Sequence, residues 1–132
     1  MHDPKFLSLE QVLEIHRTQL TLFGGQDGIR DQAALESAIA MPQAGFGDQY
    51  LHIYPFGMAA AYAFHVAENQ PCIDGNKRTA LDCALTFLDG NGFTVENPKM
   101  TLFQAMIDVG NRRLTKDGLA KILKGLAQKR KK

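Results

Sequence analysis

The most informative part of this chain is the stretch Asp74-Gly75-Asn76-Lys77-Arg78-Thr79-Ala80. It directly precedes apolar residues at helical spacing, namely Leu81, Ala84, Leu85 and Leu88. A Gly-Asn turn that opens a helix directs free backbone N–H groups and the positive end of the helix dipole to one side, which favours anions. Lys77 and Arg78 add positive charge, and the Asp74 carboxylate is a candidate Mg²⁺ ligand. Together these features indicate nucleotide chemistry.

Apolar residues recur at helical spacing nearly throughout the chain, which predicts an all-α single domain of about six helices. Ser8 and Gln11 form a capping-box sequence, and Gly24-Gly25 ends the first helix. Asn97 followed by Pro98 predicts a later helix start. The predicted helices cover about residues 9–23, 31–40, 55–68, the Asp74–Arg78 turn to 90, 97–113 and 115–126, with a loop at 69–73.

Residues 43–54 depart from the helical pattern. Gly45, Gly47 and Asp48 interrupt it, and Phe46 and Tyr50 lie between and after them. We therefore expect a short irregular or hairpin-like flap before the central helices.

Length and composition bound the class of protein. The chain has 132 residues and a net charge of +1, which fits one domain over 1–132 with its core at about 6–126. The near-neutral charge gives no general electrostatic case for nucleic-acid binding. A basic tail, residues 127–132, follows the core, and its last four residues, Lys129-Arg130-Lys131-Lys132, are expected to be a solvated, frayed end.

The location of the protein is also predicted from what the sequence contains. No apolar run reaches membrane-spanning length, and the first residues lack the apolar core of a signal peptide, so a cytoplasmic protein without membrane contact is expected. Cys72 and Cys83 are expected to be two reduced thiols, since eleven residues of helix would separate them by about 16 Å.

The motif resembles that of the Fic/Doc (Fido) superfamily, and most closely its death-on-curing (Doc) branch. That branch carries His-Pro-Phe-x-Asp-Gly-Asn-Lys-Arg, where this chain has Gln70-Pro71-Cys72-Ile73-Asp74-Gly75-Asn76-Lys77-Arg78. Supporting matches are Gly24-Gly25, Gly28-Ile29-Arg30-Asp31, Leu35-Glu36-Ser37-Ala38, Thr79-Ala80 and Phe87-Leu88. The resemblance covers about residues 6–126 and implies a Fic/Doc-type helical bundle.

The resemblance implies a role for each matching residue. Asp74 would coordinate Mg²⁺ on the nucleotide phosphates, and Arg78 would clamp a phosphate. Gly75 and Asn76 would shape the anion-binding turn, with Asn76 also orienting the loop. Lys77 is the residue of the Doc branch, whereas Fic proteins that transfer AMP usually carry Gly there.

The resemblance also implies an activity and partners. Doc-type proteins are kinase-like toxins that transfer the terminal phosphate of ATP to a threonine of elongation factor Tu and arrest translation. Each is paired with an antitoxin whose disordered tail folds as a helix into a groove on the toxin. In this family the flap docks the target segment, which here would involve Phe46, Tyr50 and His52.

Two positions depart from the family pattern. Gln70 replaces the His that would accept the proton of the target hydroxyl, and a carboxamide can only orient a hydroxyl or water. General-base catalysis typically contributes about 10²–10⁴-fold, so a slow enzyme is expected as readily as an inactive one. Cys72 replaces a core Phe, and Phe56, Phe64 or Phe87 are candidates to fill that space.

Histidines elsewhere in the chain are candidates to replace the missing base. His65 is expected to be a packed structural residue, and His16 falls on the apolar face of the first helix. His52, in the flap, is the better substitute of the candidates, although a base role is not favoured for it.

Three functions therefore remain open at this point. The first is a Doc-like toxin that phosphorylates a protein hydroxyl with Mg-ATP. The second is a catalytically impaired binding module with the same fold, which Gln70 motivates. The third is an AMP transferase, which Lys77 disfavours because its side chain would crowd the pocket needed for that pose.

Overall fold

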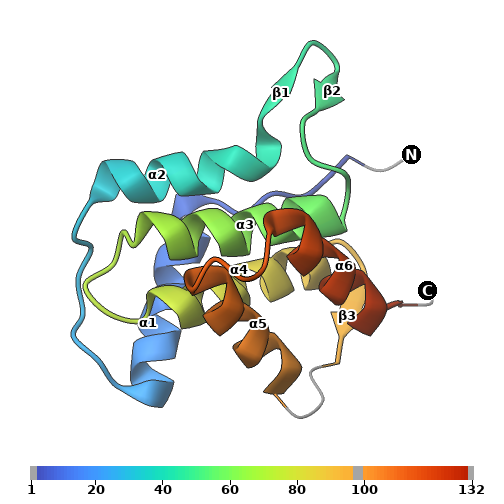
Figure 1. The fold of residues 1–132 in the computed structure, drawn as a ribbon. Coiled ribbons are helices and arrows are strands. Elements are labelled where there is room, and N and C mark those ends of the chain that lie inside the picture. The colour runs from blue at the N-terminus through green and yellow to red at the C-terminus, as the bar shows by residue number, and fades with distance from the viewer. Residues whose placement is uncertain (1–2, 97–99, 131–132) are drawn as a thin grey trace.

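The computed structural model of the chain describes residues 3–96 and 100–130. Within these residues the fold consists of six α-helices, one 3₁₀ turn and two small two-stranded antiparallel sheets, which confirms the predicted helical domain (Figure 1). The elements in chain order are α1 (Leu9–Phe23), α2 (Gln32–Ala40), η1 (Met41–Gln43), β1 (Gly45–Phe46), β2 (Gln49–Tyr50), α3 (Phe56–Asn69), α4 (Asn76–Gly90), β3 (Phe93–Val95), α5 (Thr101–Gly110), α6 (Lys116–Leu126) and β4 (Ala127–Lys129).

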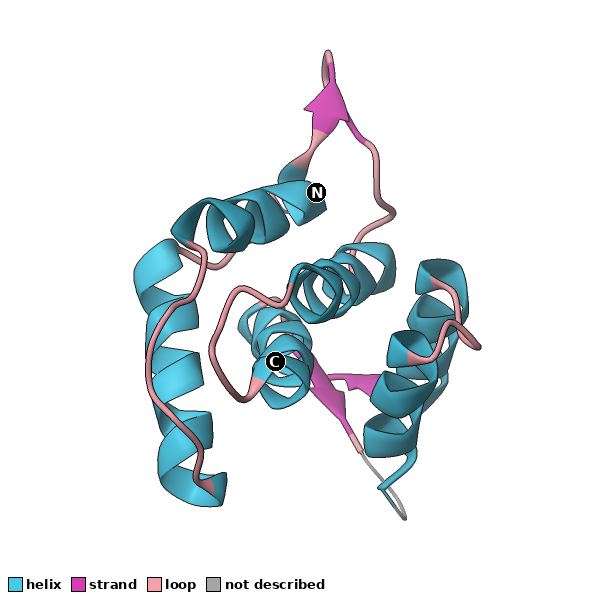
Figure 2. Ribbon diagram, turned by 60° about the vertical axis from the view of Figure 1, so that its left-hand side comes forward, coloured by secondary structure: helices cyan, strands magenta, loops and turns pink. Residues whose placement is uncertain are grey.

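Helices α3 and α4 form the centre of the molecule, and the other helices surround them. Figure 2 shows α1 and α2 on one side of this pair and α5 and α6 on the other. Both central helices bury small side chains completely, including Ala59, Ala60 and Ala63 on α3 and Ala80 and Ala84 on α4. Small side chains at a contact allow helix axes to approach closely, as the alanine-rich sequence of α3 predicts.

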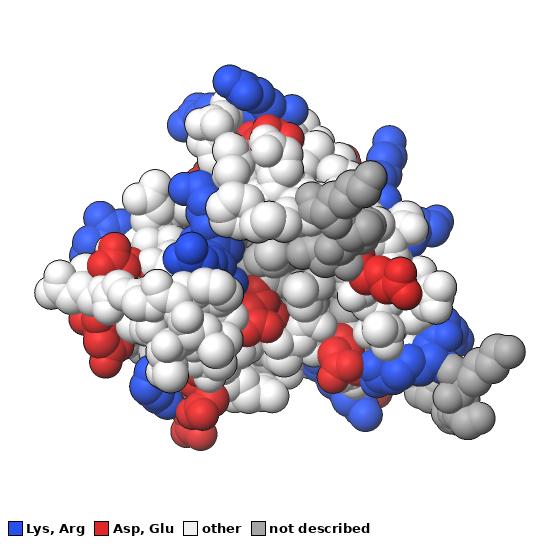
Figure 3. Space-filling view, turned by 90° about the horizontal axis from the view of Figure 1, so that it is seen from below, with Lys and Arg blue, Asp and Glu red and all other residues white. Residues whose placement is uncertain are grey.

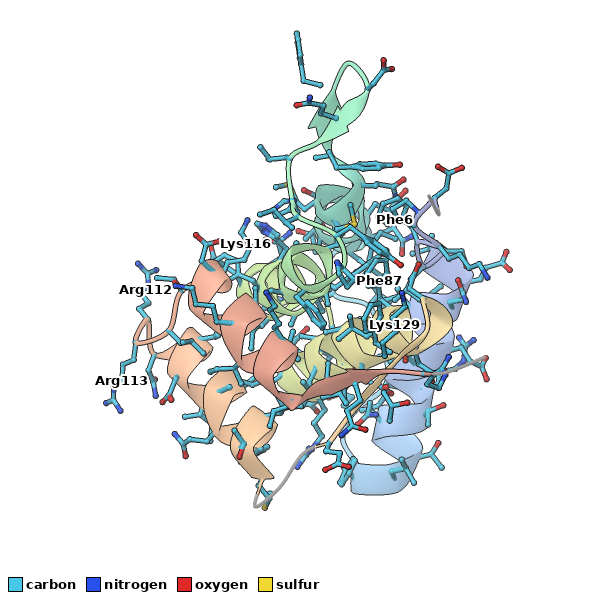
Figure 4. The ribbon with its side chains drawn as sticks, turned by 90° about the vertical axis from the view of Figure 1, so that its right-hand side faces the viewer. Phe6, Phe87, Arg112, Arg113, Lys116 and Lys129 are labelled. Carbon is cyan, nitrogen blue, oxygen red and sulfur yellow. The ribbon has the colours of Figure 1, made fainter. Side chains whose placement is uncertain are left out.

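Aromatic side chains attach the N-terminal segment to this core. The rings of Phe6 and Phe87 are stacked with their centroids 5.9 Å apart, and both side chains are labelled in Figure 4. Tyr62 is fully buried, and its hydroxyl accepts a hydrogen bond from the Leu7 N–H at 2.8 Å. The segment before α1 is therefore part of the packed domain.

The helix ends follow the capping signals of the sequence. The side chains of Ser8, Asp31 and Thr115 accept hydrogen bonds from backbone N–H groups at the starts of α1, α2 and α6. Gly24 ends α1 with a φ of 81°, a conformation that favours glycine. The predicted start at Asn97-Pro98 lies outside the described residues, and α5 ends earlier than the predicted 113.

The prediction of a frayed C-terminal end is wrong for Lys129 and Arg130. β4 pairs with β3, a strand that the sequence analysis did not predict, in the register Phe93↔Lys129 to Val95↔Ala127. The Arg130 guanidinium donates to the Asp89 carboxylate at 2.6 Å and to its carbonyl oxygen at 2.6 Å. Backbone pairing and an ion pair therefore fix a segment whose composition alone indicates a solvated tail.

The flap prediction is confirmed as a hairpin. β1 and β2 pair in the register Gly45↔Tyr50 and Phe46↔Gln49, and the hairpin projects from the helical body in Figure 1.

The space-filling view in Figure 3 shows basic and acidic side chains interspersed on the face opposite the hairpin. Among the described residues, no helix combines the length and apolarity needed to cross a membrane.

Candidate functional site

The motif occupies the connection between α3 and α4, where the chain reverses direction. Gln70 follows α3 with φ 45° and ψ 54°, and Gly75 precedes α4 with φ 78° and ψ 20°. Both residues are in the left-handed region, which glycine adopts readily and glutamine does not. The tight turn places the N-terminus of α4 beside the end of α3.

Asn76 fixes the shape of this loop. Its side-chain oxygen accepts a hydrogen bond from the Cys72 N–H, and its side-chain nitrogen donates to the Cys72 carbonyl, both at 2.9 Å. The loop-orienting role that the resemblance implies for Asn76 thus has a direct structural basis.

The connection between α1 and α2 also holds the loop, alongside which it runs in Figure 1. The Arg30 N–H donates to the Pro71 carbonyl at 2.8 Å, and the Ile73 N–H donates to the Gly28 carbonyl at 3.1 Å. The Arg30 guanidinium also donates to the carbonyl of Gln70. A Cβ on Gly28 would lie 2.8 Å from Ile73 Cδ1, so glycine permits this close approach.

Asp74 is anchored by the end of α1. Its Oδ2 accepts a hydrogen bond from the Gln26 N–H at 2.8 Å, and its carbonyl accepts one from His16 Nε2 at 2.8 Å. A Cβ on Gly25 would lie 3.2 Å from Asp74 Cβ. His16 is buried as predicted, and it is also a support of the motif.

The motif side chains line one pocket of about 370 Å³. Arg78 Cζ lies 4.5 Å from the centroid of the Phe23 ring, in a cation–π arrangement. The side chain of Lys77 runs against α5, where a Cβ on Gly110 would meet Lys77 Cε at 3.0 Å. The lining residues are Ala67, Gln70, Ile73, Asp74, Gly75, Asn76, Lys77, Arg78 and Phe103.

The donor set of this pocket fits a phosphate with a bound Mg²⁺. Mg²⁺ is usually held in proteins by one or two carboxylates together with phosphate oxygens and water. Asp74 Oδ1 has no hydrogen-bond partner among the described residues, whereas Oδ2 is held by Gln26. The structure therefore brings together the six residues predicted for chemistry, from Gln70 and Asp74 to Arg78, at one helix N-terminus.

The three flap residues predicted to dock a target do not line this pocket. Phe46 is 94% exposed in the hairpin, and Tyr50 packs edge-on against Phe6 with ring centroids 5.6 Å apart. The hairpin leads into the start of α3 while the motif follows its end, and a helix of this length spans about 21 Å. The structure therefore separates the flap from the motif by the length of α3.

His52 lies instead in a second pocket of about 600 Å³, between residues 51–57 and α6. Lys116 Nζ donates to His52 Nε2 at 2.9 Å and to His65 Nε2 at 3.1 Å, and Figure 4 shows Lys116 at the start of α6. Burial, and then the Lys116 charge, lower the pKa of His65 to about 4, and the same two causes lower the pKa of His52. Both imidazoles are therefore acceptors for one ammonium.

The cysteines are free and buried, as the sequence predicts for reduced thiols. Burial raises the pKa of Cys72 to about 11, and it also raises the pKa of Cys83. The three phenylalanines considered as replacements for the motif Phe contact other rings: Phe56 lies on Phe93, Phe64 on His65 and Phe87 on Phe6.

Comparison with known proteins agrees with this geometry. Residues 6–88 match the Fic/DOC family, and the chain belongs to that family. A protein named Toxin Doc from Mycolicibacterium smegmatis is 37% identical over 113 residues, which is 80% of this chain and 82% of the relative. Protein kinase doc of Escherichia phage P1 is 31% identical over 97 residues, or 73% of this chain and 76% of that protein.

Some residues at the site were missed as site residues by the sequence analysis. Phe103 lines the pocket from α5. Phe23 does not line it, but its ring contacts Arg78, which does. Neither residue belongs to the motif, and only the packing of α5 and α1 around the loop places them there. Arg30 lies in a segment that the family resemblance had already marked, but its bond to the loop could not be read from spacing.

Proposed function

We propose that this chain is a Doc-like toxin that transfers the terminal phosphate of Mg-ATP to a threonine or serine hydroxyl of a protein, elongation factor Tu in the first instance. The observation that carries the proposal is the pocket in which the Asp74, Lys77 and Arg78 side chains meet the N-terminus of α4. The relationship to a protein named a kinase and to one named a toxin supports the same activity.

The charge of each motif side chain suggests its role in the proposed reaction. Asp74 would hold Mg²⁺, which supplies charge neutralisation on the phosphates when bound. The Arg78 guanidinium and the N–H groups at the start of α4 would hold phosphate oxygens, since both are donors directed at an anion. Lys77 would add charge from the side of α5.

The reaction forms a bond between the target hydroxyl oxygen and the γ-phosphorus as the bond from that phosphorus to the ADP oxygen breaks. Gln70 can orient the hydroxyl but cannot take its proton, which would pass to water or to a phosphate oxygen. Phosphoryl transfer depends mostly on positioning and charge stabilisation. The chain would therefore be a slow kinase, improved by about 10²–10⁴-fold when Gln70 is replaced by His.

Intact-mass analysis tests this proposal. Elongation factor Tu is incubated with Mg-ATP and either the unaltered chain or the Gln70→His variant, with Asp74→Ala and Arg78→Ala as inactive controls. A phosphate-sized gain that both controls abolish is the expected result. A gain that persists in both controls, or an adenylyl-sized gain, would contradict the mechanism.

Gln70 itself favours a second candidate function, a binding module that retains the fold and nucleotide site without turnover. Calorimetry with Mg-ATP separates the two possibilities. Tight binding together with an unmodified target, for both the unaltered chain and Gln70→His, would support the module. Multiple turnovers by either protein would exclude it.

We further propose that the antitoxin segment docks in the larger pocket as an acidic amphipathic helix. Leu51 and Ile53 are 70% and 82% exposed there, and α6 supplies Lys116, Lys121 and Lys124 beside them. Exposed apolar residues flanked by lysines are complementary to a helix with one apolar and one acidic face. Lys121→Glu is expected to weaken binding of the cognate antitoxin, whereas Lys5→Glu, outside the pocket, is the matched control.

The flap would contribute to recognition of the target. A segment of roughly seven extended residues spans the length of α3, so one target segment can reach both the hairpin and the motif pocket. Phe46→Ala is expected to raise KM for elongation factor Tu without changing the affinity for Mg-ATP. An unchanged KM would remove the flap from the proposal.

A further inference from the structure

The contact between Phe23 and Arg78 joins the end of α1 to the motif. Phe23 is the last residue of α1, and its side chain is 58% exposed, so it contributes little to the buried core. Its ring nevertheless lies against the guanidinium, with Arg78 Cζ 4.5 Å from the ring centroid. Arg78 also lines the motif pocket, so the aromatic residue contacts a side chain at the proposed phosphate site.

The position of Phe23 is set by the motif loop itself. Directly after Phe23, Gly25 approaches Asp74 closely, and the Gln26 N–H donates to the Asp74 carboxylate at 2.8 Å. Two turns earlier in α1, His16 donates to the Asp74 carbonyl at 2.8 Å. On both sides of Phe23, the chain is therefore bonded to Asp74, in the loop that leads directly into the first turn of α4, where Arg78 lies.

The Phe23 ring attracts the positive charge of the guanidinium and so favours one position for it. An exposed arginine otherwise loses conformational freedom when it binds a phosphate, and a prior contact with the ring reduces that loss. Arginine has five N–H donors, which can bind phosphate oxygens. The carbonyl end of α1 also carries partial negative charge that favours a cation at this place.

We propose that Phe23 is a positioning residue that orients the Arg78 guanidinium for an anionic phosphate ligand. The inference rests on the proposed phosphate-binding role of Arg78 and adds a residue outside the motif to the site. Removing the ring should weaken phosphate binding without altering the fold, and it should have no further effect once Arg78 is gone.

Calorimetric titration with Mg-ATP tests this coupling. Phe23→Leu is expected to weaken binding about two- to five-fold, the range of an exposed cation–π contact. Phe23→Trp should restore it, because the indole offers the stronger ring face. Leu22→Ala is the matched control, since Leu22 is 66% exposed beside Phe23 and should leave the affinity unchanged. Circular dichroism confirms that each variant is folded.

Two further variants, Arg78→Ala alone and Arg78→Ala combined with Phe23→Leu, distinguish this inference from the proposed function. Arg78→Ala should weaken binding about tenfold or more, and Phe23→Leu should add nothing in that background. If Arg78→Ala weakens binding but Phe23→Leu leaves it unchanged or tightens it, the positioning role is overturned and the proposed function stands. If the unaltered chain does not bind Mg-ATP, the proposed function fails and the inference with it.

Discussion

The side-chain amide of Asn76 forms two hydrogen bonds, both 2.9 Å long, with the backbone N–H and C=O of Cys72. A side-chain amide can donate and accept at once, so Asn76 pairs with both backbone polar groups of the buried residue Cys72. The first residue of α4 thereby fixes the loop from which the Asp74 carboxylate projects. Asn76 is a structural requirement of the site before any ligand binds.

Asn76→Ala is expected to lower the free energy of unfolding by about 1–3 kcal/mol, because the two backbone groups of buried Cys72 lose their partner. Urea denaturation followed by circular dichroism measures this change. Asn111→Ala, at the exposed end of α5, is the matched control and should change stability by less than about 0.5 kcal/mol. Equal effects at both positions would contradict the loop-anchoring role of Asn76.

Gly28→Ala is expected to destabilise the chain by about 1–3 kcal/mol, because Gly28 has a φ of +132° and an added Cβ would lie 2.8 Å from Ile73 Cδ1. Gly90→Ala provides the opposite control. Gly90 ends α4 with open space around its Cα, so alanine there should be neutral or stabilise by up to about 1 kcal/mol. Thermal melts of the two variants should therefore shift apart, and melts that shift together would argue against strain at Gly28.

The free energy of unfolding should fall as the pH is lowered, because His52 and His65, which both accept hydrogen bonds from Lys116, are harder to protonate in the folded chain than in the unfolded chain. Burial and the Lys116 charge hold the pKa of His65 at about 4 in the folded chain, below 6.5 in the unfolded chain, and the pKa of His52 is also lowered. The unfolded state then binds more protons than the folded state between about pH 4 and 6.5, so this contribution is complete above 6.5 and is lost as pH falls toward 4.

Lys116→Met tests the cause of these shifts. Removing the ammonium should raise the pKa of both imidazoles, because the Lys116 charge is, after burial, the second largest cause that lowers each of them. NMR titration of the histidine ring protons measures each value. Lys121→Met is the control, since Lys121 lines the same pocket without a hydrogen bond to either imidazole, and a similar rise in that variant would assign the shift to the general charge of α6.

The two thiols should be inert while the chain is folded. Cys72 is 2% exposed and Cys83 is fully buried, and burial raises the pKa of both. A thiolate is the reactive form, so a disulfide exchange reagent at pH 8 should react slowly with the native chain and rapidly with both thiols in denaturant. Fast reaction of one thiol under native conditions would show that the motif loop opens readily, since Cys72 lies within it.

Local sequence determined the helices and the central turn. The capping residues Ser8, Asp31 and Thr115 act on N–H groups within three residues of themselves, so their effects can be read without knowing the fold. Gly75 and Asn76 likewise specify the start of α4 through short-range geometry. The resemblance to the family motif then predicts that Gln70, Asp74, Lys77 and Arg78 belong to one site.

Long-range packing determined the remainder. The pairing of Val95 with Ala127 and the bond from Arg130 to Asp89 join segments whose own composition indicates loop and tail. Likewise, the contact of Arg78 with Phe23 joins residues that are far apart along the chain. The chemical groups of the motif and the helix that presents them follow from residues that are neighbours in the chain, so they can be predicted from sequence. The residues that support the motif, and the separation of the hairpin from it by the length of α3, depend on how the helices pack and are visible only in the folded chain.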